Sequence, residues 1–489
     1  MVTIPGTIPG GRALKPARIA ARRDPSRAER LGPHLAAAAV AVQFLVSSNL
    51  LFALGINYGT PGGNPLAKFH PSTYLAALAA LATVRAQGGA RASLARVLRE
   101  APALVAFVAA MLFCAAYVTV SVGSSGAAVY VENYVSAGLL AFALEASPPG
   151  ERRACARLVL VLCLANVAVA VGETLAQAHL VPVYLGETAF QDAAGEFRAT
   201  AGFAHPLGGA AATMMTLLLL PAMRLRPAVA AACFLALVVG LLAFGGRTAL
   251  VCSAAAFAAA GAGSALRGLV ARRSNPRRVA AALLAAVVLP AVAYLLLTET
   301  PIGERLVGHF YLDESAEARG TQWLVLDHLM PRETLFGVTE DRFPALAFAL
   351  GLQPPFNDIE NPWLLTFLKL GAVGFAAYLA GLVPFLVHLW RRSAFWGRVL
   401  VVCGLIVASS NNSLGHKSAA LFLLTAFVVV STGFGPAEAG QRRSAEAPPA
   451  GPLVQVAPRL LELEPQRLSR ARALRAAVRP PPRNAPTAT

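Results

Sequence analysis

Runs of about 20 apolar residues, separated by short polar or basic segments, are the main pattern along the chain. The hydrocarbon core of a bilayer takes one such run per helical crossing, so each run predicts a transmembrane helix. We mark twelve runs, at 35–56, 68–84, 102–122, 125–145, 157–176, 205–223, 228–245, 248–265, 279–298, 363–389, 399–412 and 418–434. The pattern predicts an all-α polytopic membrane protein with about twelve transmembrane helices.

The composition excludes an ordinary soluble domain, because 56% of the residues are hydrophobic, only 14% are charged and the mean hydropathy is +0.59. All six cysteines lie in predicted helices or on the predicted inner side, so no extracytoplasmic disulfide framework is expected. Residues 1–34 lack a short apolar region followed by a small-residue cleavage site. We therefore interpret 35–56 as a retained first helix rather than a signal peptide.

The basic residues predict the orientation, since Lys and Arg accumulate in short cytoplasmic loops. With the N-terminus inside, 33 of the 42 Lys and Arg residues fall in inner segments. Both termini are therefore expected in the cytoplasm. The net charge of +17 then reflects topology, and no nucleic-acid partner is expected.

The chain divides into five predicted parts. These are a basic cytoplasmic segment at 1–34, transmembrane helices 1–9 at 35–298 with an extracytoplasmic loop at 177–204, a large extracytoplasmic loop at 299–362, transmembrane helices 10–12 at 363–434, and a basic cytoplasmic tail at 435–489. We expect the tail to be disordered and to contact anionic membrane lipid. A loop of about sixty residues is long for a connector and typical of a functional element.

Nine basic residues remain on the predicted outer side, where topology disfavours them. They are Lys68, Arg198, Arg247, Arg305, Arg319, Arg332, Arg342, Lys369 and Lys417. Polar groups near membrane depth are costly and usually face a cavity, so Arg198, Arg247 and Arg319 are candidate site residues, with an anchor to lipid phosphate as the alternative. Arg305, Arg332 and Arg342 stand beside acidic residues in a loop, which favours a solvated or loop-pairing role over catalysis. For Glu132 and Glu173, near outer helix ends, an interfacial role is favoured.

Arg198, Arg247 and Arg319 are the outward arginines of most interest. Arg198 and Arg247 stand at outer helix ends, and Arg319 lies in the segment 317–330, where it recurs at helical spacing with Trp323, Leu326 and Met330. That segment predicts an amphipathic interfacial helix that ends before Pro331. A guanidinium binds phosphate oxygens bidentately and keeps its charge at every accessible pH. Together the three arginines predict an anionic ligand, a diphosphate, at the outer membrane surface.

Several short segments share this outward placement. They are Arg198-Ala-Thr-Ala-Gly202-Phe203-Ala-His205-Pro206, Gly246-Arg247-Thr248, Arg319-Gly-Thr-Gln-Trp323, Leu335-Phe336-Gly337, Glu360-Asn361-Pro362-Trp363-Leu364 and Leu370-Gly371. In order and spacing, over residues 150–430, they resemble the O-antigen ligase and Wzy-type polysaccharide polymerase superfamily of bacterial inner membranes, including its exopolysaccharide polymerases.

The resemblance implies a GT-C-like glycosyltransferase that works outside the cytoplasmic membrane. The donor would be a glycan on undecaprenyl diphosphate, and the acceptor a sugar hydroxyl on another lipid-linked glycan in a polymerase, or on lipid A core in a ligase. The diphosphate is itself the leaving group, so neither ATP, a metal nor another cofactor is expected. Arginines would stabilise its developing charge. Partners of such an enzyme would include a flippase or a chain-length regulator.

A general base should deprotonate the incoming hydroxyl. Ligases of the family place a His-Asn pair in the late loop, whereas this chain has Glu360-Asn361, preceded by Asp358. We favour Glu360 or Asp358 as the base ahead of His205, and the departure favours a polymerase; His309 and His328 are further alternatives. Glu360 can instead serve as a carboxylate at a helix N-terminus, and His205 as a helix cap. Two carboxylates alone are a weak metal signal.

Glycines accompany these candidate residues. Gly202 and Gly208 are expected to let the backbone approach the ligand closely. Asn361 is a supporting residue beside the base.

A secondary transporter is the competing class, because twelve helices with both termini inside is also a carrier layout. It would predict internal repeats and ionisable residues at the bilayer midplane, and the sequence has neither. A sensor or scaffold would predict a soluble domain, for which the tail is too short and too biased in composition.

Overall fold

The computed structural model describes residues 27–59, 64–121, 124–185, 188–190, 197–270, 322–339, 342–349 and 359–434. All of them fall within one compact unit, Met1–Phe434. The apolar run at 279–298, Arg319, Asp358 and the tail at 435–489 lie outside the described residues.

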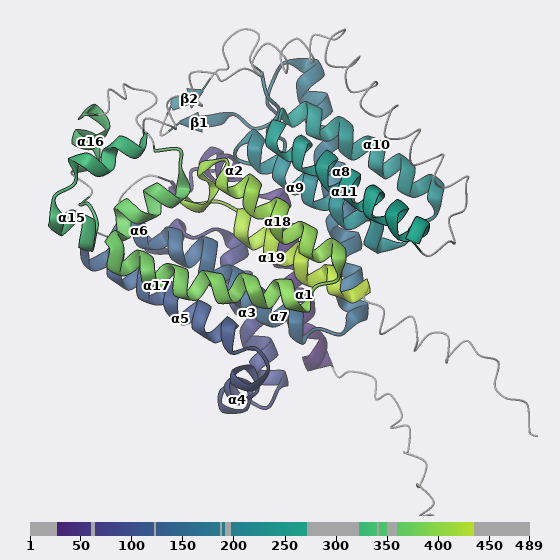
Figure 1. Ribbon diagram of the computed structural model, residues 1–489, viewed down its shortest axis with the longest axis horizontal. Helices are drawn as coiled ribbons and strands as arrows, with labels where there is room; N and C mark the ends of the chain where they lie inside the picture. Colours follow the sequence, from purple (N-terminus) through teal and green to yellow (C-terminus); the bar gives the residue numbers. More distant parts are fainter. Residues whose placement is uncertain are drawn as a thin grey trace, which may run out of the picture. The chain divides into compact units, whose positions relative to one another are not determined.

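The described chain is helical apart from one antiparallel hairpin, in which β1 (Val183–Leu185) pairs with β2 (Thr188–Phe190). The α-helices in Figure 1 are α1 (Arg27–Leu45), α2 (Ser48–Ala53), α3 (Pro71–Ala86), α4 (Ala90–Glu100), α5 (Pro102–Ser121), α6 (Ser124–Val129), α7 (Ser136–Ala146), α8 (Pro149–Ala176), α9 (Pro206–Leu219), α10 (Pro227–Phe244), α11 (Arg247–Val270), α15 (Pro331–Phe336), α16 (Phe343–Ala349), α17 (Pro362–Arg392), α18 (Phe395–Ser409) and α19 (Ala420–Ser431). A π-helical segment, η2 (Tyr130–Val135), joins α6 to α7. The short 3₁₀ helices are η1 (Pro65–Lys68), η3 (Leu220–Met223), η4 (Gln322–His328), η6 (Asn412–Leu414) and η7 (Thr432–Phe434).

Seven helices in the described part of the chain are long and apolar enough to cross a membrane. They are Pro102–Ser121, Gly126–Ala146, Pro149–Ala176, Pro206–Met223, Pro227–Phe244, Arg247–Ala265 and Pro362–Arg392. Each overlaps a predicted run, and five begin at a proline, which suits the first helical turn. The runs at 399–412 and 418–434 form shorter apolar helices. The fold is that expected of a helical membrane protein, and the count of twelve spans stays a prediction.

The apolar run at 35–56 was predicted to be one helix, and this was wrong: the structure divides it into α1 and α2. The hydroxyl of Ser47 accepts a hydrogen bond from the Leu50 N–H (3.1 Å) and so caps α2. The His70 ring bonds to the carbonyl of Val46 (2.7 Å). In a continuous helix Leu50 N–H would donate to Val46 C=O. Here the Ser47 hydroxyl binds the Leu50 N–H and the His70 ring binds the Val46 carbonyl. The backbone bond between them is therefore lost, which explains the break in the helix.

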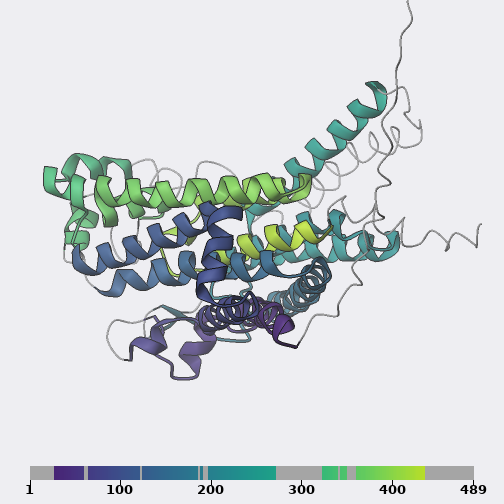
Figure 2. The ribbon, with the colours of Figure 1, turned by 90° about the horizontal axis from the view of Figure 1, so that it is seen from below.

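The helices pack through small residues and aromatic rings. The central helix is α19, in which every residue from Leu421 to Val430 is buried, and it contacts α7, α8, α9 and α18. α17 lies along α5 (Figures 1 and 2), where Phe107 and Phe385 stack with their ring centroids 4.1 Å apart. A β-carbon at Gly381 would lie 2.5 Å from Ala110 Cβ, so only glycine permits this approach. Small residues at helix contacts are typical of membrane bundles.

Because the chain runs back and forth, helix ends gather in two places. At one, the Asn49 side chain after α1 donates to the Ala204 carbonyl before α9 (3.0 Å). At the other, Arg392 in the last turn of α17 bonds to Glu145 in the last turn of α7 (2.9 Å). We call these the Arg198 end and the Arg392 end.

A small second core lies under the loop that precedes α17. It comprises Val325, Val338, Leu346, Ile359, Leu364, Leu365 and Leu368. We expected an amphipathic α-helix at 317–330, and this was wrong for Gln322–His328, which form the 3₁₀ helix η4. Three residues per turn put Gln322 and Val325 on one face, and both are buried, while Trp323 is 49% exposed.

Two glycines, Gly337 and Gly371, allow the chain that follows α15 to pack closely against α17. Gly371 has φ 61° and interrupts α17 with a non-helical conformation, and Gly337 has φ 91°. A β-carbon at Gly371 would lie 2.4 Å from both the Gly337 nitrogen and the Leu335 oxygen. The Val338 N–H donates to the carbonyl of Leu368 (2.7 Å) beside them. Backbone therefore lies directly against backbone, which no other residue type permits at these positions.

Candidate functional site at the Arg198 end

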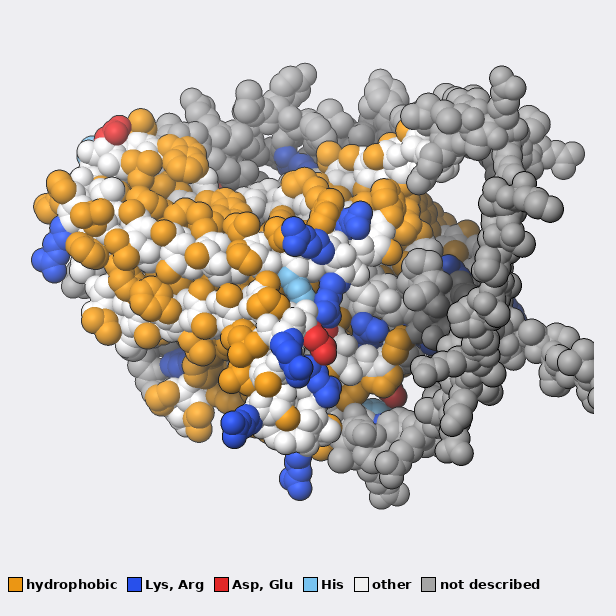
Figure 3. Space-filling view, turned by 60° about the horizontal axis from the view of Figure 1, so that its bottom comes forward, with side chains coloured by type: hydrophobic (Ala, Val, Ile, Leu, Met, Phe, Trp, Pro, Cys, Tyr) orange, Lys and Arg blue, Asp and Glu red, His pale blue; other side chains and the backbone are white. Residues whose placement is uncertain are grey.

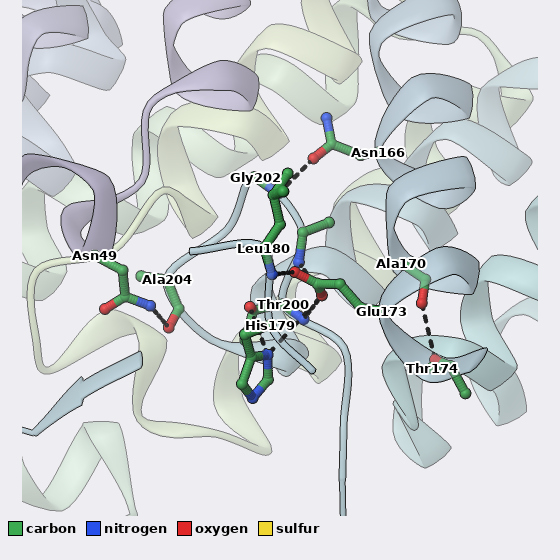
Figure 4. Close-up of polar contacts among 11 residues, drawn as sticks. Asn49, Asn166, Ala170, Glu173, Thr174, His179, Leu180, Thr200, Gly202 and Ala204 are labelled. Carbon is green, nitrogen blue, oxygen red and sulfur yellow. Dashed lines mark hydrogen bonds and ion pairs between the residues drawn. The ribbon is translucent and has the colours of Figure 1, made fainter. Parts of the chain in front are cut away.

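Residues 197–205 form the loop that enters α9, and Glu173 in the last turn of α8 holds its first half. One oxygen of the Glu173 carboxylate accepts hydrogen bonds from the N–H groups of Thr200 (2.8 Å) and Ala201 (2.9 Å). The other accepts from the N–H of Leu180 (2.8 Å), as Figure 4 shows. The carboxylate is only 4% exposed, so these three donors replace its water.

Two asparagines hold the second half of the loop. Asn166 Oδ1 accepts from the Gly202 N–H (2.8 Å), and Asn49 Nδ2 donates to the carbonyl of Ala204 (3.0 Å), both drawn in Figure 4. Phe203 packs edge-on against aromatic rings of α1 and α10, with centroid distances of 5.6 and 6.2 Å. The loop is thus fixed against four helices, α1, α2, α8 and α10.

Arg198 extends from this loop toward the turn between α10 and α11. Gly245 ends α10 in the left-handed conformation (φ 67°), and a β-carbon there would lie 3.7 Å from Arg198 Cδ. Arg247 begins α11 two residues later and is half-buried. Arg198 is exposed, and no carboxylate of a described residue lies within ion-pair distance of it. The structure therefore brings Arg198 beside the turn that carries Arg247, while Arg319 lies outside the described residues.

His205 is the N-cap of α9, as its alternative interpretation anticipated. Its Nδ1 accepts a hydrogen bond from the Leu207 N–H (3.2 Å). The side chain keeps part of its surface exposed, yet surrounding protein atoms, and then the positive charge of Arg198, lower the pKa of His205 below its ordinary value. The ring is therefore neutral at physiological pH, with its proton on Nε2.

Glu360 and Asn361 lie where α17 begins. Asn361 Oδ1 accepts from the N–H groups of Trp363 (3.0 Å) and Leu364 (3.2 Å), so Asn361 is the N-cap. Glu360 is half-buried and comes one residue before the cap. α18 contacts both α9 and α17 and lies between them in Figure 1. The contacts of the described residues do not bring Glu360 next to Arg198.

The three lysines predicted on the outer side also lie at the Arg198 end. Each donates to backbone carbonyls: Lys68 to Asn57 (2.9 Å), Lys369 to Gly415 (3.1 Å), and Lys417 to Tyr58 (3.0 Å) and Lys68 (2.8 Å). Arg342 pairs with Glu333 (3.1 Å), which confirms the loop pairing predicted for it. These contacts join loops to one another.

Glu132 lies inside the protein rather than at an interface, which corrects the role favoured for it from the sequence. It is 7% exposed and belongs to the π-helical segment. The Tyr58 hydroxyl and the His70 N–H donate to its two oxygens, and the Lys417 ammonium lies 4.5 Å from the centroid of the Tyr58 ring. Burial, and then the negative charge of Glu132, raise the pKa of Tyr58, so the phenol stays protonated and donates.

Sequence reasoning missed Glu173 and Asn166 as the groups that shape the Arg198 loop. The sequence does mark Glu173 as unusual, because a carboxylate near the end of an apolar run is costly unless the protein supplies hydrogen bonds to it. Two of its three backbone partners, Thr200 and Ala201, lie 27 and 28 positions further along the chain, so only the fold identifies them. Asn166 gave no comparable signal.

No model of a known protein family matches the chain, and no curated protein matches it. Among the described residues, no three His, Cys, Asp or Glu side chains group closely enough to hold a metal ion.

Gly202→Ala is expected to destabilise the protein by about 2 kcal/mol through overpacking. The added β-carbon would lie 2.4 Å from the Phe44 carbonyl oxygen and 2.5 Å from Asn166 Oδ1. Gly208→Ala is the matched control, since its β-carbon would only meet Phe203 at 3.9 Å. Thermal unfolding in detergent should show a lower Tm for the first variant alone. Equal Tm values would show that the loop does not pack against Asn166.

Proposed function

We propose that the protein transfers glycosyl groups outside the cytoplasmic membrane of a bacterium, polymerising oligosaccharide repeats carried on undecaprenyl diphosphate. Both termini would lie in the cytoplasm and the Arg198 end would face outward. The product would be an exopolysaccharide or an O-antigen. Ligation of the glycan to a different acceptor is the alternative outcome of the same chemistry.

The observation that carries this proposal is the position of Arg198. Its guanidinium is exposed at one end of an apolar helical unit, beside the turn that carries Arg247, and no described carboxylate neutralises it. Glu173 and Asn166 fix the backbone that presents it. A preorganised guanidinium at a membrane surface suits the diphosphate of a lipid-linked glycan.

In the proposed reaction the acceptor hydroxyl oxygen attacks the anomeric carbon of the donor sugar. The bond from that carbon to the diphosphate oxygen breaks, and undecaprenyl diphosphate leaves with the electron pair. A base takes the hydroxyl proton. Arg198 and Arg247, with Arg319, would stabilise the charge that develops on the leaving oxygen.

Glu360 suits the role of base better than His205. The Nδ1 of His205 already accepts the Leu207 N–H, and its Nε2 carries the proton, so the neutral ring has no free lone pair to offer. Glu360 is half-buried, and its carboxylate has acceptor positions on two oxygens. Asp358 stays a candidate of the same kind.

Glu360→Gln is expected to lower polymerisation about a hundredfold, because the amide cannot take a proton. His205→Asn is the paired variant, since asparagine preserves the helix cap and should retain near wild-type activity. Initial rates with the lipid-linked substrate measure both. A loss confined to His205→Asn would make the histidine the base instead.

The proposal is tested with purified protein in nanodiscs, given a synthetic undecaprenyl-diphosphate oligosaccharide without metal or ATP. A ladder of products one repeat apart, resolved by mass spectrometry, is expected. Transfer of a single glycan to a lipid A core acceptor would indicate a ligase. Binding of the labelled lipid with no product from any acceptor would contradict the proposal and favour transport.

A further inference from the structure

A cavity of about 210 Å³ opens at the Arg392 end, where α7, α8, α17 and α19 converge. Its apolar wall consists of Leu389, Val428 and Val429. Its polar lining consists of Glu145, Arg152, Arg392, Ser393 and Thr432. The cavity is remote from residues 197–205 and takes no part in the proposed glycosyl transfer.

Arg152, which lines this cavity, carries one donor that no described group uses. One terminal nitrogen of its guanidinium donates to the hydroxyl of Thr432 (2.8 Å). Its Nε–H is buried and has no hydrogen-bond partner among the described residues. A buried donor without a partner is costly, so the guanidinium of Arg152 gains from any acceptor that binds beside it, whether a water or an anion.

The Glu145 carboxylate does not accept the Arg152 Nε–H. One of its oxygens bonds to His388 Nε2 (2.8 Å) and the other to Arg392 (2.9 Å), so both are taken within the protein. Arg152 forms no ion pair with it. The cavity therefore keeps an excess of positive charge on the Arg152 side.

The surroundings of the cavity are basic and apolar. Exposed arginines at this end include Arg99, Arg391 and Arg398. Figure 3 shows a face of the molecule on which Lys and Arg side chains gather beside a broad apolar surface. Val387 and Trp390 on α17, each 40% exposed, belong to the apolar surface near the cavity. Such a border between apolar and basic surface is typical of a contact with phospholipid headgroups.

We propose that this cavity, the Arg152 cavity, binds a phosphate group through the guanidinium groups of Arg152 and Arg392. The phosphate belongs either to the headgroup of an anionic lipid or to a free phosphate ion. A planar guanidinium offers parallel N–H donors that match two phosphate oxygens. Arg392 already binds Glu145 and the Glu100 carbonyl (3.0 Å), so Arg152 supplies the main contact.

The test uses the full chain purified in a zwitterionic detergent. Native mass spectrometry counts bound dioctanoyl phosphatidylglycerol, with dioctanoyl phosphatidylcholine as the zwitterionic comparison. Thermal unfolding in rising inorganic phosphate tests the free ion, with chloride at equal ionic strength. We expect one tightly bound phosphatidylglycerol if the source is lipid, or a Tm that rises with phosphate alone if the source is the free ion.

Arg152→Gln is expected to weaken ligand binding about tenfold or more, because it removes the positive charge and the guanidinium donors. Arg153→Gln is the matched control, since Arg153 donates to the Gly433 carbonyl (3.2 Å) and does not line the cavity. Arg392→Gln is a second variant in case Arg152→Gln fails to fold. Wild-type affinity in both cavity variants, or no binding of either ligand by the wild type, would overturn the proposal.

Discussion

Arg198→Ala is expected to reduce polymerisation about a thousandfold while the protein stays folded in the membrane at wild-type amounts. Removing one preorganised donor from a developing negative charge typically costs a hundred- to a thousandfold, that is about 3–4 kcal/mol of transition-state stabilisation. Because Arg198 is exposed and its loop is held by other residues, its loss should not disturb the fold. The measurement is the initial rate of ladder formation in nanodiscs, beside a Tm.

Two further variants test whether the planar guanidinium of Arg198, rather than any positive charge, is required. Arg198→Lys keeps the charge but loses the planar fork, and it should also fail if two phosphate oxygens are bound together. Arg342→Ala is the control, because that arginine pairs with Glu333 in a different loop and should leave the rate within about twofold. Polymer of normal length and rate from Arg198→Ala would remove the basis of the proposed function.

Glu173→Ala should lower the free energy of unfolding by about 3 kcal/mol or more. It leaves three N–H groups, those of Leu180, Thr200 and Ala201, without their acceptor, and each buried donor left unpaired costs about 1–3 kcal/mol. It also opens a cavity at the end of α8. Activity should fall with stability, because the loop that presents Arg198 loses its attachment.

Thr174→Ala is the matched control for Glu173→Ala. Thr174 is the next residue in α8, and its hydroxyl bonds only to the carbonyl of Ala170 within the same helix (2.8 Å; Figure 4). Its loss should change the stability by less than about 1 kcal/mol. Unfolding of both variants in the same detergent, followed by circular dichroism, gives the comparison. Equal and small effects would show that the carboxylate does not hold the loop.

The sequence predicted the long helices well because hydrophobic length is a local property. Five runs that begin at or near a proline became helices starting at that proline, such as Pro206 and Pro362. The prediction failed at 35–56, where the ring of His70, the N-cap residue of α3, binds the carbonyl of Val46 that a continuous helix would use. It also failed to predict the 3₁₀ form of η4, whose buried face depends on packing against Ile359 and Leu368.

The candidate site was predictable only in part. The charge and the placement of Arg198 and Arg247 are visible in the sequence, and the caps at His205 and Asn361 follow from the prolines after them. The proximity of Arg198 to Gly245 depends on how α9 and α10 pack, which no local pattern contains. The same holds for Glu132 and Tyr58, which are separated by 74 positions in the chain.

Because of the second core, the Arg198 loop and the Glu360 segment of the proposed site should differ in the free energy of local opening. Phe203, next to Gly202, belongs to the main core, so the Arg198 loop can open only with the bundle. The segment before α17 belongs to the small core instead, and Gly371 stands where the two cores meet. A small cooperative unit opens at a lower free energy than the whole fold. The segment that carries Glu360 is therefore expected to exchange its amide hydrogens faster than the Arg198 loop.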